Sequence, residues 1–443
     1  MSVIGELASF VAGADAAALP AAERERLALH LTDTVVAALA GARIAEGKAL
    51  QSFGDQGSLA DRIGRRAAAI RLTEIDDIHL PSCTTPSAGI VPVALALAQA
   101  SRNFDAAEIA GAIWAGTEIM TRFGMAVSGP QILYRGIWPT YLAAPVAAAA
   151  TASRLLGLNE ARTGHALSLA VMLMAGGVGR IHGAPSGRWF LYANAVAGGV
   201  AAAQAARWDY CGDPGVLDKT WLADTHGIAL DHKRLTEGLG AASVYSALSM
   251  KPICSAKQGI AAIEAFRAIL AGGIRPEAIA KVRVRVPQAY AGMIAMRAEP
   301  GVRQSTLVSV AYQIALAAFE PERLSDIDRS APVANERLAS FAAKVEIAAD
   351  AALEAFYPQH WPAEVEVEAG GKVVRRRVVE AAGDPERPLG RSEVDDKAHR
   401  VLDPLLGPAR TGEWLTLCHD ALTGADACKR LAKAFASADA ATS

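Results

Sequence analysis

Apolar positions recur at helical spacing through the first 263 residues or so of the chain. In the segment 21–42, Leu27, Leu31 and Val35 lie four positions apart, so they share one face of a helix. The same criterion predicts further helices at 89–100, 106–121, 139–156, 161–175 and 191–206. Small side chains dominate their faces, which lets helix axes approach closely. We therefore expect a large all-helical domain.

The period changes near residue 281. The segments 281–286 and 364–368 alternate polar and apolar residues, as half-buried strands do. The pair Gly370-Gly371 then turns the chain into 372–379, which predicts a hairpin. A further strand and an apolar helix are expected at 344–347 and 304–319. This part of the chain therefore predicts a small antiparallel sheet with helices.

Helical spacing returns after residue 388, at 392–406, 411–422 and 425–435. We expect these terminal helices to pack on the first domain. The predicted fold is mainly α: an all-helical domain of residues 1–263 and 399–443, with an inserted, smaller α+β lid domain of residues 264–398. The crevice between the two domains is then the expected ligand site.

Composition excludes several classes of function. The net charge is −2, so no basic field favours nucleic acid or an anionic membrane. The uncharged stretches are too short and too polar to span a bilayer. Five scattered cysteines without a C-x-x-C pair fit a reducing compartment, and the N-terminus lacks signal-peptide features. We expect a cytoplasmic protein.

Chemically active side chains crowd into the segment 74–87, where Glu74, Asp76, Asp77 and His79 precede Thr84-Thr85-Pro86-Ser87. Phosphate-binding, dinucleotide-binding, zinc-protease and nucleophile-elbow motifs are missing from the sequence. The nine histidines are spread singly, so no metal-ligand cluster can be read from the sequence. Acid/base chemistry without a cofactor is the simplest enzymatic interpretation.

Five segments resemble the MmgE/PrpD family in their order and spacing. They are the first helix (31–41), the Thr-Pro-Ser helix (85–98), Gly-Ile-Trp-Pro-Thr (136–140) with Leu-Leu-Gly-Leu (155–158), Lys-Pro-Ile-Cys (251–254) and Ser-Val-Ala-Tyr (309–312). The resemblance implies a helical domain with an α+β lid, a homodimer, and cofactor-independent action on small di- and tricarboxylates. The family includes 2-methylcitrate dehydratase, cis-aconitate decarboxylase and iminodisuccinate epimerase.

The resemblance also implies roles for single residues. Lys251 matches the family's active-site lysine, as a carboxylate clamp or a desolvated base. Tyr312 matches the lid tyrosine, as a proton donor or hydrogen-bond anchor. Asp76 and Asp77 match the family's acidic pair, and adjacent carboxylates on a helix cannot face the same way. Asp76 or the nearby Glu74 is therefore the candidate general base.

The chain departs from the family pattern at four positions. Ile78 replaces a threonine, Thr85 and Trp138 replace two histidines, and Arg188 replaces a lysine. Imidazole shuttles protons near neutral pH, which threonine and indole cannot do. Arg188 still binds a carboxylate, and does so bidentately. The four changes therefore preserve groups that bind a polyanion but remove groups that could protonate a leaving group.

Other side chains are candidates for the missing functions. His79 follows the acidic cluster directly, and Tyr141 lies one helical step beyond Trp138. Arg180 and Arg188 flank a glycine-rich segment suited to anion docking, and Trp138 and Thr85 are kept as substrate-binding candidates. His182 and Lys257 are weaker candidates.

Three functions stay open at this point. The leading hypothesis is a lyase that abstracts an α-proton from a small polycarboxylate and eliminates a group, like 2-methylcitrate dehydratase. An epimerase shares the carbanion but needs two bases and no leaving-group acid, so the missing histidines favour it; decarboxylation is a further outcome. The non-enzymatic hypothesis is an inactive paralogue that binds a carboxylate ligand.

Overall fold

The computed structural model describes residues 2–52, 57–100, 104–174, 187–241, 244–329 and 335–438. The chain divides into two compact units. Unit 1 comprises Met1–Leu248 and Leu402–Ser443, and unit 2 comprises Ser249–Val401.

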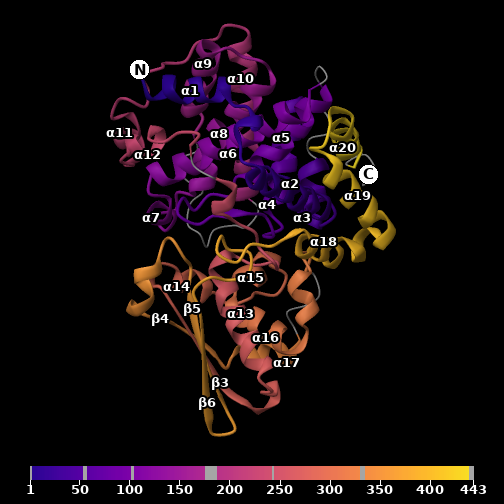
Figure 1. The fold of residues 1–443 in the computed structure, drawn as a ribbon. Helices are drawn as coiled ribbons and strands as arrows, with labels where there is room; N and C mark the ends of the chain where they lie inside the picture. Colours follow the sequence, from indigo (N-terminus) through magenta and orange to yellow (C-terminus); the bar gives the residue numbers. More distant parts are fainter. Residues whose placement is uncertain are drawn as a thin grey trace. The chain divides into compact units, whose positions relative to one another are not determined.

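Unit 1 is built from helices. They are α1 (Val3–Gly13), α2 (Ala21–Gly41), α3 (Ala45–Ser52), α4 (Leu59–Arg71), α5 (Ser87–Ala100), α6 (Ala106–Ala126), α7 (Gly129–Leu133), α8 (Pro139–Leu155), α9 (Glu160–Met172), α10 (Gly187–Arg207), α11 (Trp221–His226), α12 (His232–Thr236), α19 (Pro408–Asp420) and α20 (Ala425–Ser437). The two-residue strand β1 (Ile78–His79) and the 3₁₀ turns Ala16–Ala18 and Tyr245–Ala247 also belong to unit 1, and the strand β2 (Leu248–Ser249) includes the last residue of unit 1 and the first of unit 2. Figure 1 shows the helices crowded around α8, α6 and α4.

Glycines set the helix spacing around α10. A Cβ on Gly64 of α4 would lie 2.1 Å from the carbonyl oxygen of Ala193 on α10. A Cβ on Gly199 of α10 would lie 2.1 Å from the carbonyl oxygen of Pro145 on α8. Only glycine permits such backbone approach. The contacts hold the middle part of α10 against α4 and α8, and this sets the direction of the helix that carries Arg188 and Trp189.

The terminal helices pack within unit 1, α19 against α2 and α20 against α5. Helix α18 (Arg391–Leu406) runs from unit 2 into unit 1. The predicted boundary at residue 263 falls inside α13 (Lys257–Ala271), all of which belongs to unit 2. The mainly α fold class is confirmed, while the lid arrangement stays a prediction.

Unit 2 combines a four-stranded sheet with helices. The strands are β3 (Ile279–Val286), β4 (Val345–Ala349), β5 (Ala363–Ala369) and β6 (Lys372–Val378), in the order β4-β3-β5-β6. The helices are α13, α14 (Gln288–Ile294), α15 (Arg303–Val308), α16 (Val310–Phe319), α17 (Glu336–Ala342) and most of α18, with 3₁₀ turns at Pro276–Ala278, Pro321–Ser325 and Ala351–Phe356. Figure 1 shows β3, β5 and β6 side by side.

Two predictions for unit 2 need correction. The expected antiparallel sheet is wrong at one edge, where β4 pairs parallel with β3. The helices between these two strands return the chain to the same end of the sheet, as a parallel connection requires. The apolar segment 304–319 is two helices, because Ser309 adopts an extended conformation and its Oγ accepts from the Tyr312 amide at 3.4 Å.

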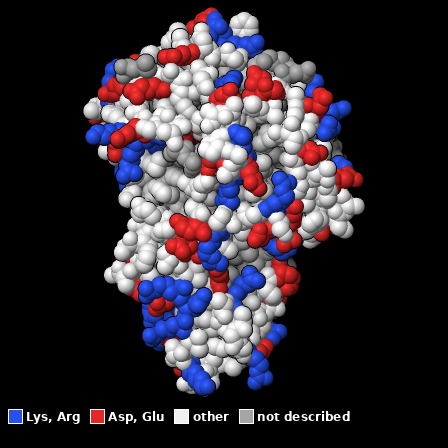
Figure 2. Space-filling view, in the orientation of Figure 1, with Lys and Arg blue, Asp and Glu red and all other residues white. Residues whose placement is uncertain are grey.

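One sheet face carries a ladder of opposite charges. Glu366 on β5 accepts from Arg283 at 2.7 Å and from Arg375 at 2.6 Å, while Arg285 pairs with Glu364 at 3.2 Å. The opposite face buries Val282, among other valines. Acidic and basic side chains are likewise interspersed over the face of the molecule in Figure 2. The alternation seen in the sequence therefore separates an ion-pair face from a core face.

Within the described ranges, no single helix is both long and apolar enough to cross a membrane, although the bent pair α2–α3 meets the criteria when its two helices are taken together.

Glu366→Gln should lower stability in a pH-dependent way. Hydrogen bonds from Arg375 and Arg283 lower the pKa of Glu366 to about 2. A depressed folded-state pKa adds stability above the unfolded pKa, near 4.5, and that stability is lost as pH falls toward 2. We expect urea denaturation to show a loss of about 1 kcal/mol at pH 7 for this part-screened group, fading below pH ~4.

Glu368→Gln on the same strand is the matched control and should change stability by less than about 0.5 kcal/mol. An equal loss at pH 7 and pH 2 in Glu366→Gln would show that the ladder charge is not what stabilises the sheet.

Candidate functional site

The loop that joins α4 to α5 holds two residues in a strained backbone conformation. Glu74 and Cys83 have φ angles of 55° and 54°, in the left-handed region that non-glycine residues rarely occupy. Thr73 fixes the start of the loop, since its Oγ1 donates to the Ile70 carbonyl at 2.6 Å and accepts from the Ile75 amide at 3.3 Å. Such strain persists only where surrounding contacts hold it, and it is concentrated at functional sites.

A buried charge cluster holds this loop. Nη1 of Arg71, in the last turn of α4, donates to both carboxylate oxygens of Asp76 at 2.7 Å. Its Nη2 lies 3.5 Å from Oε1 of Glu74, and Nη2 of Arg188 lies 3.4 Å from the same oxygen. Glu74 therefore lies between two guanidinium groups, and two cations balance two carboxylates.

Arg188, in the first turn of α10, contacts two indoles. Its guanidinium carbon is 4.9 Å from the ring centroid of Trp138 and 4.0 Å from that of Trp189. Both distances are within cation–π range. Burial lowers the pKa of Arg188, an effect that Tyr141 and Glu74 partly offset. For Arg71, burial acts in the same direction but is outweighed by Asp76 and Glu74, so its pKa is raised well above the ordinary value.

Two tyrosines extend the aromatic stack. Tyr141 stacks on Trp138 with ring centroids 5.5 Å apart, and the ring centroids of Tyr141 and Tyr192 are 4.9 Å apart. Burial raises the pKa of both phenols, so both are neutral at physiological pH. Within the described part of the chain, neither hydroxyl has a hydrogen-bond partner. The cluster therefore presents uncharged donors beside its guanidinium groups.

Asp77 points into a separate network. Its carboxylate accepts from the Ser87 Oγ at 2.5 Å and the Ser87 amide at 3.2 Å, and contacts Nδ1 of His30 at 2.9 Å. His30 is on α2 and Ser87 begins α5. Asp77 thus ties the loop to two helices, while Asp76 faces Arg71. The two carboxylates point in different directions as expected, although they lie in a loop and not on a helix.

His79 is held within its own turn. Its Nδ1 lies 2.9 Å from the Ser82 Oγ, which lies 2.6 Å from the Thr84 Oγ1. Burial lowers the pKa of His79 to about 4, so the ring is neutral at pH 7. Thr85 contacts the helix that carries Tyr141. Its amide donates at 3.1 Å to the Oγ1 of Thr140, the residue before Tyr141.

Lys251 and Tyr312 belong to unit 2, and both are buried. The Tyr312 hydroxyl has no partner among the residues that the structure describes. Lys257 forms a buried ion pair with Asp384, which also accepts from the Ser249 Oγ at 2.5 Å. That pairing indicates a structural role for Lys257. Arg180 and His182 lie outside the described residues.

The structure brings five of the predicted site residues together in unit 1, namely Glu74, Asp76, Trp138, Tyr141 and Arg188. It adds three that the sequence interpretation missed: Arg71, Trp189 and Tyr192. The available signal was spacing, since Arg71 precedes Glu74 by three positions and Tyr192 follows Arg188 by four.

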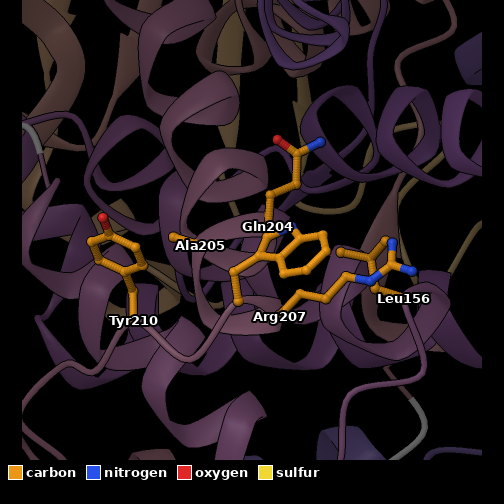
Figure 3. A pocket seen from close by; sticks show the side chains of 6 residues that line it. Leu156, Gln204, Ala205, Arg207 and Tyr210 are labelled. Carbon is orange, nitrogen blue, oxygen red and sulfur yellow. The ribbon is translucent and has the colours of Figure 1, made fainter.

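A surface hollow lies apart from the charge cluster, and the described residues form no metal-binding group. A surface hollow of about 530 Å³ is lined by Leu156, Gln204, Ala205, Arg207, Trp208 and Tyr210 around the end of α10. It is shown in Figure 3, and it contains no predicted site residue. Across the described ranges, His, Cys, Asp and Glu side chains form no group of three or more that could hold a metal ion.

Arg71→Ala should destabilise unit 1 strongly. The substitution leaves the buried Asp76 carboxylate without its guanidinium, and breaking a buried pair in this way costs about 3–5 kcal/mol. Urea denaturation measures the loss. Arg162→Ala is the matched control, because Arg162 pairs with Asp209 at the surface, with side chains 42% and 73% exposed. It should cost at most about 1 kcal/mol. Similar small losses in both variants would contradict the cluster's structural role.

Comparison with known families supports the resemblance seen in the sequence. The MmgE/PrpD N-terminal domain matches residues 65–226, and the MmgE/PrpD C-terminal domain matches residues 254–420. No curated protein matches the chain significantly. The N-terminal match contains the whole charge cluster, from Arg71 to Tyr192, and the C-terminal match contains Tyr312. The two matches together span most of the sequence, and the chain belongs to the MmgE/PrpD family.

Proposed function

We propose that the protein is a cofactor-independent lyase that abstracts an α-proton from a small di- or tricarboxylate and eliminates a group to form an alkene. Members of the MmgE/PrpD family are generally enzymes of the dehydratase or lyase type. The observation that carries the proposal is the buried carboxylate of Glu74 between Arg71 and Arg188. It combines a base with cations that stabilise the negative charge developing on the substrate.

Glu74 is the better general base of the two carboxylates. Asp76 holds Arg71 with both oxygens at 2.7 Å, so its lone pairs are committed to that guanidinium. The guanidinium contacts of Glu74, at 3.4 and 3.5 Å, are longer than ordinary hydrogen bonds. In the proposed reaction Glu74 takes the α-proton, and Asp76 keeps Arg71 in place.

Arg188 is the proposed clamp for a substrate carboxylate. Its guanidinium carbon lies within 5 Å of two indole ring centroids, and a planar guanidinium can bind a carboxylate bidentately. These ring contacts restrict the guanidinium before substrate arrives, which reduces the entropy lost on binding. Lys251 and Tyr312 stay predicted contributors from unit 2.

Tyr141 is the proposed proton donor to the leaving group. Its hydroxyl is buried and neutral at physiological pH. Tyr141 lies one helical turn beyond Trp138, and Trp138 is the residue that replaces a histidine of the family pattern. The C–H proton passes to Glu74, the C–H electron pair forms the double bond, and the departing hydroxide takes the Tyr141 proton to leave as water. The phenolate formed is stabilised by the nearby Arg188 and Arg71.

Epimerisation is the second candidate function. It uses the same carbanion but returns a proton to the opposite face, so it needs no leaving-group acid. Thr85 and Trp138, where the family has histidines, favour it, as does the neutral state of His79. Decarboxylation and ligand binding without turnover are the remaining outcomes.

Incubation with citrate, 2-methylcitrate, cis-aconitate and iminodisuccinate in D₂O, followed by NMR, separates these functions. A lyase gives alkene signals from a saturated substrate, and an epimerase gives deuterium at the α-carbon without a net product. Glu74→Gln should lower the rate by at least about 100-fold, since a general base contributes about 10²–10⁴. Glu25→Gln, at an exposed position of α2, should leave it unchanged.

Absence of both exchange and turnover with all four compounds would contradict the proposal. A Glu74→Gln rate within about threefold of wild type would leave the reaction class intact but remove Glu74 from the role of base.

We extend the proposal to a homodimer in which the end of α10 faces a second copy. Trp208 and Tyr210 are 77% and 70% exposed beside the hollow of Figure 3, and such large exposed aromatic side chains are typical of contact surfaces. Light scattering should give twice the 46.1 kDa chain mass, and Trp208→Glu should shift the protein toward monomer. A wild-type monomer at micromolar concentration would contradict the dimer.

A further inference from the structure

Four buried hydrogen-bond donors of the aromatic stack have no partner within the described ranges. They are Nε1 of Trp138, Nε1 of Trp189, and the hydroxyls of Tyr141 and Tyr192. A donor that stays unsatisfied in a protein interior costs about 1–3 kcal/mol. Four such donors on rings in mutual contact, or in contact with the same guanidinium, indicate a place for an acceptor that the described residues do not supply.

The donors gather where three long helices begin. Trp138 is the N-cap of α8 and Tyr141 is in its first turn, while Trp189 and Tyr192 are in the first two turns of α10. Gly89, in the first turn of α5, lies so close that a Cβ there would be 2.8 Å from the Tyr192 hydroxyl. A helix N-terminus carries partial positive charge. Three N-terminal turns around unpartnered donors favour an anionic acceptor.

The charges nearby are already balanced among themselves. Among the described residues, Arg71 and Arg188 face Glu74 and Asp76, so these four groups together carry no net charge when all are ionised. An entering carboxylate therefore needs donors beyond these ion pairs. Neutral N–H and O–H groups with helix N-termini meet this need, and a carboxylate has about four lone-pair sites to accept from them.

We propose that Tyr141, Tyr192 and the two indoles form a subsite for one carboxylate of a small polycarboxylate, held by uncharged donors and not by imidazolium. The ligand class rests on the proposed function, while the subsite rests on the geometry of the stack. In the bound complex the Tyr141 proton is hydrogen-bonded to this carboxylate, and in the proposed elimination it passes to the hydroxide that departs beside it. Tyr141 and Tyr192 are then specificity-determining residues, because a substrate without a second carboxylate leaves their hydroxyls unpaired.

The proposal has a consequence for pH dependence. Burial raises the pKa of both phenols above 10, so the donors keep their protons through neutral and mildly alkaline pH. Arg188 and Arg71 stay charged over the same range, and Glu74 and Asp76 face them from the loop. His79 is already neutral, with a pKa of about 4. The affinity for a carboxylate ligand is therefore flat from pH 6 to 9.

Calorimetric titration of the full chain with succinate and citrate tests the subsite. Tyr141→Phe and Tyr192→Phe keep the ring and remove only the hydroxyl. Each should raise the Kd by about 10- to 100-fold, the value of one hydrogen bond to a charged group. Tyr245→Phe is the matched control, since the buried Tyr245 hydroxyl lies 3.1 Å from the Thr117 Oγ1 and belongs to another contact. It should leave the Kd unchanged.

Tryptophan fluorescence gives a second readout, because succinate or citrate in the subsite should change the emission of Trp138 and Trp189. The subsite is overturned if neither compound binds the wild-type chain at 10 mM, if both phenylalanine variants keep the wild-type Kd, or if the Kd rises tenfold between pH 6 and 8 as an imidazolium site would require.

The outcomes separate this inference from the proposed function. Tyrosine-dependent binding without deuterium exchange in any compound supports the subsite and contradicts the lyase. Exchange or turnover, together with an unchanged Kd in the Tyr141→Phe and Tyr192→Phe variants, supports the function and overturns the subsite.

Discussion

The candidate site depends on one buried interaction, the double hydrogen bond from Arg71 to Asp76. Two charges taken from water must be well paired, or the loss of hydration outweighs their attraction. Arg71 meets this condition by closing on Asp76 at 2.7 Å while it also approaches Glu74. The loop after α4 is thereby bent back on the end of its own helix, which holds Glu74 at a φ of 55°. Thr73 and Asp77 anchor the loop on either side, and the Arg71–Asp76 pair adds a contact to the strained turn between them.

The fold serves the site mainly by bringing helix ends together. Gly64 and Gly199 let α10 touch α4 and α8 through backbone atoms, so the first turns of α8 and α10 place Trp138 and Arg188 in contact. The end of α4 supplies Arg71 to the same cluster. The cations, the carboxylates and the neutral donors thus come from different helices and from the loop after α4, and close contacts at glycines hold these helices together. This arrangement agrees with a site prepared for an anion before the anion arrives.

Periodicity predicted most of the helices and the β5–β6 hairpin, because spacing of apolar residues is a local property of the sequence. It could not predict the parallel pairing of β4, which depends on the path of the helices between, nor the break at Ser309, where one side chain caps a new helix. The resemblance pointed to Glu74 and Arg188, and helical spacing from Trp138 added Tyr141; the structure puts the three in one cluster. Their catalytic roles stay predictions.

Arg71 was missed for a physical reason: a basic residue in a last helical turn is ordinarily a solvated group that interacts with the helix dipole. Only the bend of the following loop turns it inward. In the sequence, Tyr192 and Trp189 have the pattern of apolar helix core. Their significance comes from the Tyr192 hydroxyl and the Trp189 Nε1, which have no hydrogen-bond partner among the described residues. His79 stood out in sequence beside the acidic pair, but its ring is engaged by Ser82.

The central claim is that an anionic substrate binds at the Arg71–Glu74–Arg188 cluster and its aromatic stack. A crystal structure of the chain with bound citrate tests it most directly. The account predicts a carboxylate within hydrogen-bond distance of Arg188 and the Tyr141 and Tyr192 hydroxyls, with Glu74 facing the carbon next to a carboxylate. Citrate bound elsewhere, with these hydroxyls contacting only protein or water, would contradict it.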